Sequence, residues 1–170
     1  MIPPSAWVAA YIHRIPAGGR VLDLACGTGR HTRLLAAGNW PVVAVDRDPD
    51  AISTIAGLHG VTVRILDLET ETWPLAGEYF DAVVVTNYLW RPHLEAVLSL
   101  LTPGGVLIYE TFMLGNAAYG KPSRPDFLLQ PGELRAICAR AGLRELAFFE
   151  GYADQPKPCV RQSIVAERPI

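Results

Sequence analysis

Short runs of apolar and β-branched residues alternate with helical patterns along this chain, and this alternation limits the fold more than any other feature of the sequence. It predicts strands at residues 20–26, 41–46, 61–68, 80–86, 103–112, 143–152 and 160–168. Helical spacing predicts helices at residues 30–38, 47–60, 94–101 and 134–141. Strands that are apolar on both faces need helices on both sides, so the sequence indicates a doubly wound α/β fold around a mainly parallel sheet.

The composition argues against several classes of function. The 170 residues suit a single domain, and the net charge of -2 gives no basic surplus for binding nucleic acid. No apolar run approaches the ~20 residues of a membrane helix, and the start of the chain lacks the pattern of a secretory signal. Cys26, Cys138 and Cys159 lie too far apart for a disulfide framework or a zinc site. We therefore expect one cytoplasmic domain, residues 1–170, without a metal, a nucleic acid or a membrane as partner; the oligomeric state stays open.

The turn after the first predicted strand, "DLACGTGRH" from Asp23 to His31, is the most specific motif. Its small residues let a ligand approach the backbone and the N-terminus of the following helix. A dinucleotide fingerprint, G-x-G-x-x-G, would place Arg30 on its third glycine, where a side chain obstructs the packing of helix on strand. Spaced as acidic-x-G-x-G-x-G, the turn instead resembles the nucleoside-binding loop of class I S-adenosylmethionine-dependent methyltransferases, with Ala25 in place of the first glycine.

This resemblance implies S-adenosylmethionine as the cofactor and a Rossmann-like, seven-stranded sheet whose last strand is antiparallel. The "PGG" before the strand at 103–112 and the closing strand pair fit the same family. The resemblance also implies that the glycine-rich turn contacts the cofactor, through Asp23, Ala25, Cys26, Gly27, Gly29 and Arg30. We expect Arg30 and its neighbour His31 to meet the cofactor carboxylate or the acceptor; a surface position is the alternative.

Two aspartates end the second and third predicted strands. Asp46 follows the glycine-rich turn by roughly 20 residues, where an acidic side chain can bind both ribose hydroxyls. In the family that the chain resembles, the carboxylate at this place binds the ribose, and the next residue, here Arg47, flanks the adenine. The acid at the end of the third strand, here Asp67, accepts from the adenine amino group, while Leu68 offers its backbone. Either aspartate alone could be a helix N-cap, but acids at both strand ends favour cofactor binding.

The fourth predicted strand runs into the polar and aromatic segment "NYLWRPH". We expect Asn87 and Tyr88 to position the reactants, Asn87 also to contact the cofactor, and Trp90 to wall the pocket. Arg91 and His93 are candidate acceptor contacts, or exposed residues at the start of a helix. The segment lacks the N-P-P-Y of amino-methyltransferases, which argues against a nitrogen of DNA or of a protein as the acceptor.

Two segments outside the predicted sheet are candidate covers of the site. Residues 113–130 form a loop longer than compact domains usually leave unstructured, so they are a candidate lid or substrate loop, with a packing loop as the alternative. Its candidate side chains are Tyr119, Lys121, Arg124 and Phe127, and Glu110 just before it is a candidate contact to the acceptor or to a loop amide. Residues 1–19 are predicted to cover the cofactor, with Trp7, Tyr11 and Arg14 near it.

A narrower resemblance concerns "DLACGTGRHTRLLA", "LDLE" and "FLLQPGELR", which are similar to the small bacterial tellurite-resistance methyltransferase family. It implies methyl transfer to a small-molecule acceptor, with a soft metalloid oxyanion or a thiol as candidates. Such a transfer depends on positioning and on exclusion of water, and a soft anion needs no general base. Two alternatives stay open: a nicotinamide-dependent reductase, and a domain that binds the cofactor without catalysis.

Overall fold

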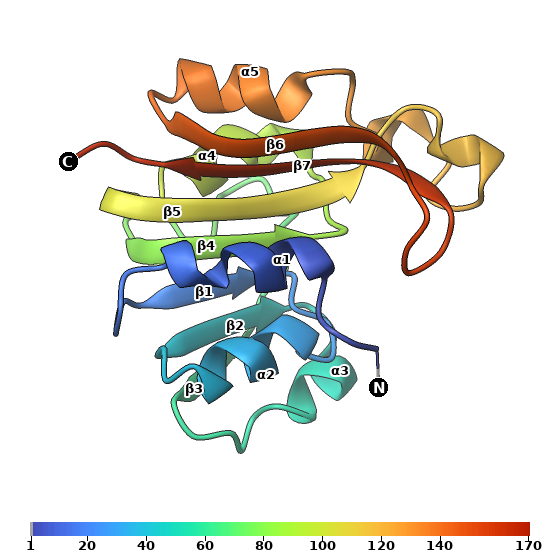
Figure 1. The fold of residues 1–170 in the computed structure, drawn as a ribbon. Helices are drawn as coiled ribbons and strands as arrows, with labels where there is room; N and C mark the ends of the chain where they lie inside the picture. The colour runs from blue at the N-terminus through green and yellow to red at the C-terminus, as the bar shows by residue number, and fades with distance from the viewer. Residues whose placement is uncertain (1) are drawn as a thin grey trace.

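The computed structural model describes residues 2–170, which form a seven-stranded sheet in the order β3-β2-β1-β4-β5-β7-β6 (Figure 1). The strands are β1 (Val21–Leu24), β2 (Val42–Asp46), β3 (Val61–Ile65), β4 (Phe80–Thr86), β5 (Leu101–Phe112), β6 (Arg144–Ala153) and β7 (Cys159–Glu167). The first five strands pair in parallel, whereas β7 is antiparallel to both β5 and β6. The predicted doubly wound fold with an antiparallel last strand is confirmed.

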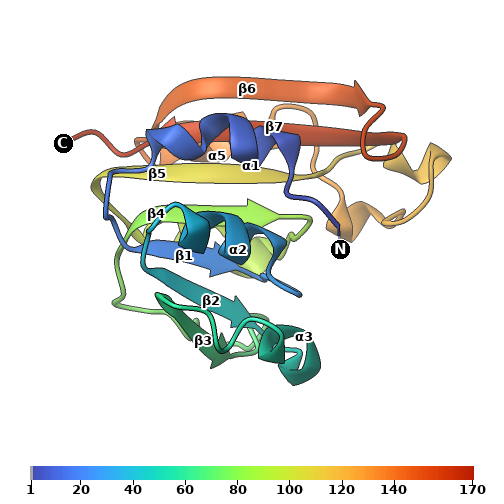
Figure 2. The ribbon, with the colours of Figure 1, turned by 60° about the horizontal axis from the view of Figure 1, so that its bottom comes forward.

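Helices cover both faces of the sheet. One face carries α1 (Ala6–Tyr11), α2 (Arg30–Ala37) and α3 (Pro49–Ser53), and Figure 2 shows α1 and α2 side by side there. The other face carries α4 (Leu94–Leu98) and α5 (Glu133–Arg140), which pack on it through their own apolar residues. Within residues 2–170, four short 3-10 helices lie in connections, at Ile12–Arg14, Arg91–His93, Asn116–Ala118 and Pro125–Phe127.

The central strand β4 shows why the sheet needs two helical layers. Val83 and Val85 belong to the core cluster under α4 and α5, whereas Ala82 and Val84 belong to the cluster under α1 and α2. Successive side chains of a strand point to opposite faces, so an unbroken apolar run buries both faces. All four residues are fully buried.

Two predicted helices are shorter than their apolar spacing suggested. The helix expected at 47–60 ends at Ser53, although Asp48 caps its N-terminus as the sequence indicates, accepting from the N–H groups of Asp50 and Ala51. The helix expected at 94–101 ends at Leu98, because Leu101 already pairs with Phe80 as the first residue of β5. Apolar residues that end a helix and begin a strand can share one helical spacing, so periodicity alone could not separate them.

A buried histidine attaches the N-terminal helix to the sheet. His31 is only 2% exposed, and its Nε2 accepts a hydrogen bond of 2.9 Å from the backbone N–H of Ser5, the N-cap of α1. The neutral imidazole therefore carries its proton on Nδ1, which lies 3.4 Å from the Thr86 hydroxyl. Burial, and secondarily the charge of Arg30, lower the pKa of His31 to about 3. The expectation that His31 meets the cofactor or acceptor is corrected, because both ring nitrogens face the fold.

The prediction that residues 1–19 cover the cofactor is also modified. Val8 and Ile15 are buried in the cluster under α1, so this segment packs along the sheet. Only its start reaches the ends of the parallel strands: Pro3 to Trp7 line a pocket there, which Tyr11 and Arg14 do not join.

Replacing His31 by glutamine tests its role. The unfolded chain protonates His31 below its ordinary pKa of 6.5, whereas the folded chain resists protonation down to about 3. The wild type should therefore lose stability as the pH falls through this window, by up to ~1.4 kcal/mol per pH unit. His31→Gln keeps an acceptor for Ser5 but cannot titrate. Urea denaturation between pH 6.5 and 4 should show that the free energies of unfolding of the wild type and of His31→Gln approach each other as the pH falls. A constant difference between the two proteins over this range would contradict the assignment.

Candidate active site

Two adjoining pockets lie at the edge of the sheet where the parallel strands end. The first, about 370 Å³, is lined by residues that follow β1, β2, β3 and β4, including Ala25, Asp46, Asp67 and Tyr88. The second, about 410 Å³, lies between the N-terminal segment and the β5, β6 and β7 strands. Asn87 and Phe112 line both pockets, so one elongated ligand or two ligands could meet there. This edge is where doubly wound sheets bind ligands.

The glycine-rich turn reaches the first pocket through Ala25, whereas Gly27 and Gly29 line neither pocket. Gly29, at φ +82°, is the N-cap of α2, and a Cβ on it would lie 2.5 Å from Ile55 Cγ2. Ala25, which stands where the family's pattern has its first glycine, also adopts a left-handed conformation, φ +53°. The turn brings the Gly27 N–H to 2.8 Å from the Asp46 carboxylate. The strained turn therefore fixes the position of the acid at the end of β2.

Asp46 and Asp67 both line the first pocket, and backbone N–H groups already use part of the hydrogen-bonding capacity of their carboxylates. Asp46 accepts from the N–H groups of Gly27 and Asp48, while Asp67 accepts from the N–H of Glu69 at 2.9 Å. Each ionised carboxylate has about four lone-pair sites, so both retain capacity for ligand hydroxyl or amino donors. Arg47 also lines this pocket and lies 3.5 Å from Glu69, and Leu68 lines it as well.

Other predicted residues of the turn serve the fold. Asp23 is buried, and its carboxylate accepts from the Thr32 hydroxyl at 2.6 Å. Burial raises the pKa of Asp23 to about 7, against the opposing effect of the Thr32 hydrogen bonds. Cys26 is buried beside Ile52 and Ile55, and burial raises its thiol pKa. The predicted cofactor contacts of Asp23 and the Cys26 side chain are therefore corrected to contacts within the protein.

Tyr88 belongs to the first pocket and not to the second. Its hydroxyl is buried and has no hydrogen-bond partner within residues 2–170, while its backbone carbonyl accepts from the Tyr109 hydroxyl at 2.6 Å. Burial, then the charges of Glu69 and Asp67, raise the pKa of Tyr88. Tyr88 is thus a neutral wall beside the two aspartates.

Asn87 marks the junction of the pockets. Its backbone is left-handed, with φ +54°, a conformation that asparagine tolerates better than most residues. Its N–H donates to the Glu110 carbonyl at 2.9 Å, and its Oδ1 accepts from Arg161 Nη2 at 2.9 Å. Arg161, on β7, was missed from the sequence. The signal was the pair Arg161 and Gln162, two polar residues inside an otherwise apolar predicted strand.

Arg161 also faces Glu110, an acid near the end of β5. Its Nη1 lies 3.6 Å from Glu110 Oε1, and its guanidinium lies over the Phe112 ring. The other Glu110 oxygen accepts from the hydroxyl of Ser163, its partner across the β5–β7 pair. Arg30 lines the same pocket and donates to the Pro3 carbonyl at 3.1 Å. The second pocket therefore combines cations with one buried carboxylate.

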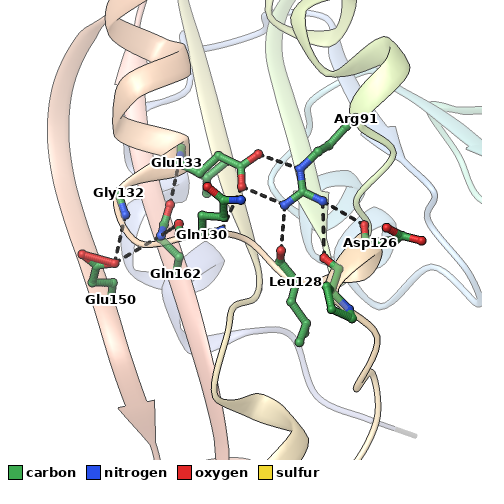
Figure 3. Close-up of polar contacts among 10 residues, drawn as sticks. Arg91, Asp126, Leu128, Gln130, Gly132, Glu133, Glu150 and Gln162 are labelled. Atoms are coloured by element: carbon green, nitrogen blue, oxygen red, sulfur yellow. Dashed lines mark hydrogen bonds and ion pairs between the residues drawn. The ribbon is translucent and has the colours of Figure 1, made fainter.

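Arg91 lies outside both pockets and organises the fold instead (Figure 3). Its guanidinium makes a two-pronged contact with the Glu133 carboxylate, both hydrogen bonds being 2.8 Å. It also donates to the carbonyls of Asp126 and Leu128, at 3.0 and 2.7 Å. The predicted acceptor contact of Arg91 is corrected, because its donors hold the 113–130 loop to the start of α5.

Gln162 completes this polar network from β7 (Figure 3). The side chain is fully buried, and its Oε1 accepts from the N–H of Leu134 in the first turn of α5 at 2.7 Å. Its Nε2 donates to the Gln130 carbonyl and to Glu150, whose carboxylate also accepts from the N–H of Gly132. These contacts fix how the loop enters α5.

The remaining predicted acceptor residues also lie away from the pockets. His93 packs against Trp73, with ring centroids 5.2 Å apart, and its Nε2 lies 2.5 Å from the Thr70 carbonyl. Tyr119 is half exposed and packs against Tyr152, with centroids 5.3 Å apart. Trp90 lines neither pocket, while its neighbour Leu89 lines the first. The acceptor contacts predicted for His93 and Tyr119 are corrected accordingly.

The 113–130 loop is held at several points in the structure. Met113 and Leu129 form an isolated bridge, and the buried Asn116 side chain donates to the Pro122 carbonyl and accepts from the Val160 N–H. Of the loop side chains singled out from the sequence, Phe127 lines the first pocket, whereas Lys121 and Arg124 line neither. The loop thus forms part of the pocket wall.

Comparison with known proteins identifies the family. A family model described as "Methyltransferase domain" matches residues 21–105, half of the chain. The chain therefore belongs to the methyltransferase domain family, and its prediction as a class I S-adenosylmethionine-dependent methyltransferase is confirmed.

Named relatives carry varied activities. The chain is 31% identical to a tRNA U34 carboxymethyltransferase of Methylococcus capsulatus, covering 79% of this chain and 47% of that protein. It is 33% identical to a ubiquinone biosynthesis O-methyltransferase of Xanthomonas axonopodis, covering 76% and 64%. The chain thus spans about half to two thirds of these relatives. The structure of TehB from Haemophilus influenzae has the same fold, with TM-score 0.75 and 18% identity over 95% of this chain and 61% of that one.

The chemistry of the first pocket fits S-adenosylmethionine. Carboxylates at the ends of β2 and β3 can accept from the hydroxyl and amino groups of a nucleoside, and the apolar Leu66 and Leu89 lie in the same wall.

Residues 2–170 contain no cluster of three or more histidine, cysteine or acidic residues able to hold a metal ion. No helix in this part of the chain is long and apolar enough to cross a membrane.

Arg91→Lys tests the anchoring network. Lysine keeps the charge but cannot form the two-pronged contact with Glu133, so the free energy of unfolding should fall by about 1–2 kcal/mol. Arg124→Lys, in the loop that Arg91 anchors, is the control, because Arg124 is exposed and its side chain makes only a 3.7 Å contact with Asp126 and a 5.9 Å contact with the Phe127 ring centroid. Urea denaturation should leave the control within about 0.5 kcal/mol of the wild type. Equal effects of both substitutions would argue against the anchor.

Ala25→Gly tests the strain in the turn. A left-handed alanine costs roughly 1–2 kcal/mol. Glycine removes this cost, but part of the gain in stability is lost because glycine makes the unfolded chain more flexible. We expect a net stabilisation of about 0.5–1 kcal/mol. Ala36→Gly, inside α2, should instead destabilise by about 1 kcal/mol. Thermal unfolding of both variants gives the two signs, and a less stable Ala25→Gly protein would contradict the strain.

Proposed function

We propose that this chain transfers the methyl group of S-adenosylmethionine to a small-molecule acceptor, with a soft metalloid oxyanion or a thiol as candidates from the narrower resemblance. The observation that carries the proposal is the meeting of two pockets at Asn87, one of which is lined by Asp46 and Asp67. One methyltransferase domain over residues 1–170 is part of this proposal, with the start of residues 1–19 as a pocket wall.

The first pocket is proposed to hold the adenosine part of the cofactor. Asp46 would accept from the ribose hydroxyls, Asp67 from the adenine amino group, and the Leu68 backbone would contact the adenine edge. Arg47 would flank the ring. Ala25, Gly27 and Gly29 would keep the turn close enough for the nucleoside to lie along it.

The second pocket is proposed to hold the methionine end of the cofactor and the acceptor. Arg30, at the start of α2, would pair with the cofactor carboxylate, and Asn87 would hold the junction. The bound cofactor supplies an activated methyl group, so the protein must chiefly align the acceptor with it and exclude water. A pocket of about 410 Å³ is large enough to enclose a small acceptor.

Asp46→Ala tests the cofactor site. The variant should lose a charge-assisted contact worth roughly 1.5–3 kcal/mol, which weakens S-adenosylmethionine binding about 10- to 150-fold. Isothermal titration measures the affinity, and circular dichroism checks the fold. Asp50→Ala is the control, because Asp50 lies on α3 nearby but outside the first pocket. Unchanged affinity in a folded Asp46→Ala protein would refute the assignment.

Turnover separates the proposal from the alternative of a domain that binds the cofactor without catalysis. A cofactor-binding domain without catalysis would bind S-adenosylmethionine but release no S-adenosylhomocysteine with tellurite, selenite, thiols, amines or carboxylates. Release with at least one acceptor is the result that the proposal requires.

A further inference from the structure

The second pocket contains a single side chain suited to taking up a proton. Of the ionisable residues that line it within residues 2–170, Arg30, Lys157 and Arg161 are cations, Cys159 is a buried thiol whose Sγ lies 3.7 Å from the Ala153 carbonyl, and only Glu110 is a carboxylate. Arginine and lysine are already protonated at neutral pH and have no acceptor site. His31, the nearest imidazole in sequence to Arg30, is committed to Ser5 and Thr86. Proton uptake in this pocket therefore falls to Glu110.

One oxygen of Glu110 makes no hydrogen bond within residues 2–170 and only a long ion-pair contact, to Arg161 Nη1 at 3.6 Å. The residue is 2% exposed, and one carboxylate oxygen accepts from Ser163 at 3.2 Å. The other, Oε1, has no hydrogen-bond partner within residues 2–170, and neither does the buried Nε of Arg161 facing the same cavity. Buried polar atoms without partners are rare because each costs about 1–3 kcal/mol. A ligand with a donor for Glu110 and an acceptor for Arg161 would satisfy both.

The position of Glu110 is suited to proton transfer at the junction of the pockets. In the β4–β5 pair, Glu110 stands opposite Thr86, and its carbonyl accepts from the N–H of Asn87. Asn87 lines both pockets and is itself held by Arg161. Glu110 is thus hydrogen-bonded through its backbone to Asn87, the residue beside which the cofactor methyl and the acceptor are proposed to meet.

We propose that Glu110 is the catalytic proton acceptor for a protic acceptor group, the hydroxyl, thiol or amino group of a small organic acid. This inference rests on the proposed function and narrows it, because it favours a thiol or hydroxyl over a metalloid oxyanion. The acid's carboxylate would lie toward Arg161 and Lys157, which with Arg30 outnumber the one carboxylate of this pocket.

The proposed step balances. A lone pair of the acceptor oxygen, sulfur or nitrogen forms the new bond to the methyl carbon, and the carbon–sulfur bond of the sulfonium breaks with its electron pair going to sulfur. The bond between the acceptor atom and its hydrogen breaks, and the proton passes to Glu110 Oε1. Glu110 then returns the proton to solvent when the products leave. Selenite, whose attacking selenium lone pair carries no proton, does not need this step.

Glu110→Gln tests the step, because the amide keeps the shape of the side chain but cannot take up the proton. The probes are salicylate, mercaptoacetate and 4-aminobenzoate, with selenite as the comparison, and the readout is S-adenosylhomocysteine release. We expect turnover of at least one organic acid, and a kcat at least about 100-fold lower in Glu110→Gln. Ser163→Ala, which removes one hydrogen bond but leaves the carboxylate, should lower kcat less than tenfold. Glu110→Asp should lie between them.

Isothermal titration of each variant with S-adenosylmethionine separates the possible failures. Near wild-type cofactor binding by Glu110→Gln, together with the loss of kcat, would support the role. Turnover of selenite alone, no turnover of any of the three organic acids, or an undiminished kcat in Glu110→Gln would overturn it while leaving the cofactor site intact. Failure of the wild type itself to bind the cofactor would instead remove the proposed function. If Glu110→Gln does not fold, a kcat in Glu110→Asp equal to that of the wild type would overturn the role.

Discussion

The hydrogen bond between Arg161 and Asn87 joins β7 to the end of β4, at the residue that both pockets share. Asn87 terminates the central strand in a left-handed conformation, and Arg161 reaches it from β7 while also facing Glu110 near the end of β5. Because the strained residue is held by partners on two neighbouring strands, it can persist where the chain alone would relax. The two pockets share this residue, so their relative position depends on the antiparallel β7 being in place.

Polar side chains near the site fall into two groups, those that can still bind a ligand and those that hold the fold. Asp46, Asp67 and Glu110 keep unused hydrogen-bonding capacity toward a pocket, whereas the donors of Arg91 and the amide of Gln162 are committed to the backbone or to Glu133 and Glu150. Charged residues buried with good partners position the scaffold, and those with open valences are the ones that a ligand can satisfy. This distinction, rather than residue type, separates Arg91 from Arg161.

The sequence predicted the sheet and much of the first pocket because both follow from local patterns. Apolar runs gave the strands, and Asp46 and Asp67 come together simply because the ends of parallel strands meet at one edge. The misassigned residues depend on distant partners: Arg91 on Glu133, 42 residues away, and His31 on Ser5, 26 residues away. No spacing rule encodes such pairs. Arg161 was missed for the same reason, since its partner Asn87 lies 74 residues away.

The most direct test of the account is a crystal structure of the chain with S-adenosylhomocysteine bound. We expect the ribose hydroxyls within hydrogen-bonding distance of Asp46, the adenine against Asp67 and Leu68, and the sulfur directed past Asn87 into the pocket that contains Glu110. A nucleoside bound elsewhere, or one whose sulfur faces away from that pocket, would contradict it.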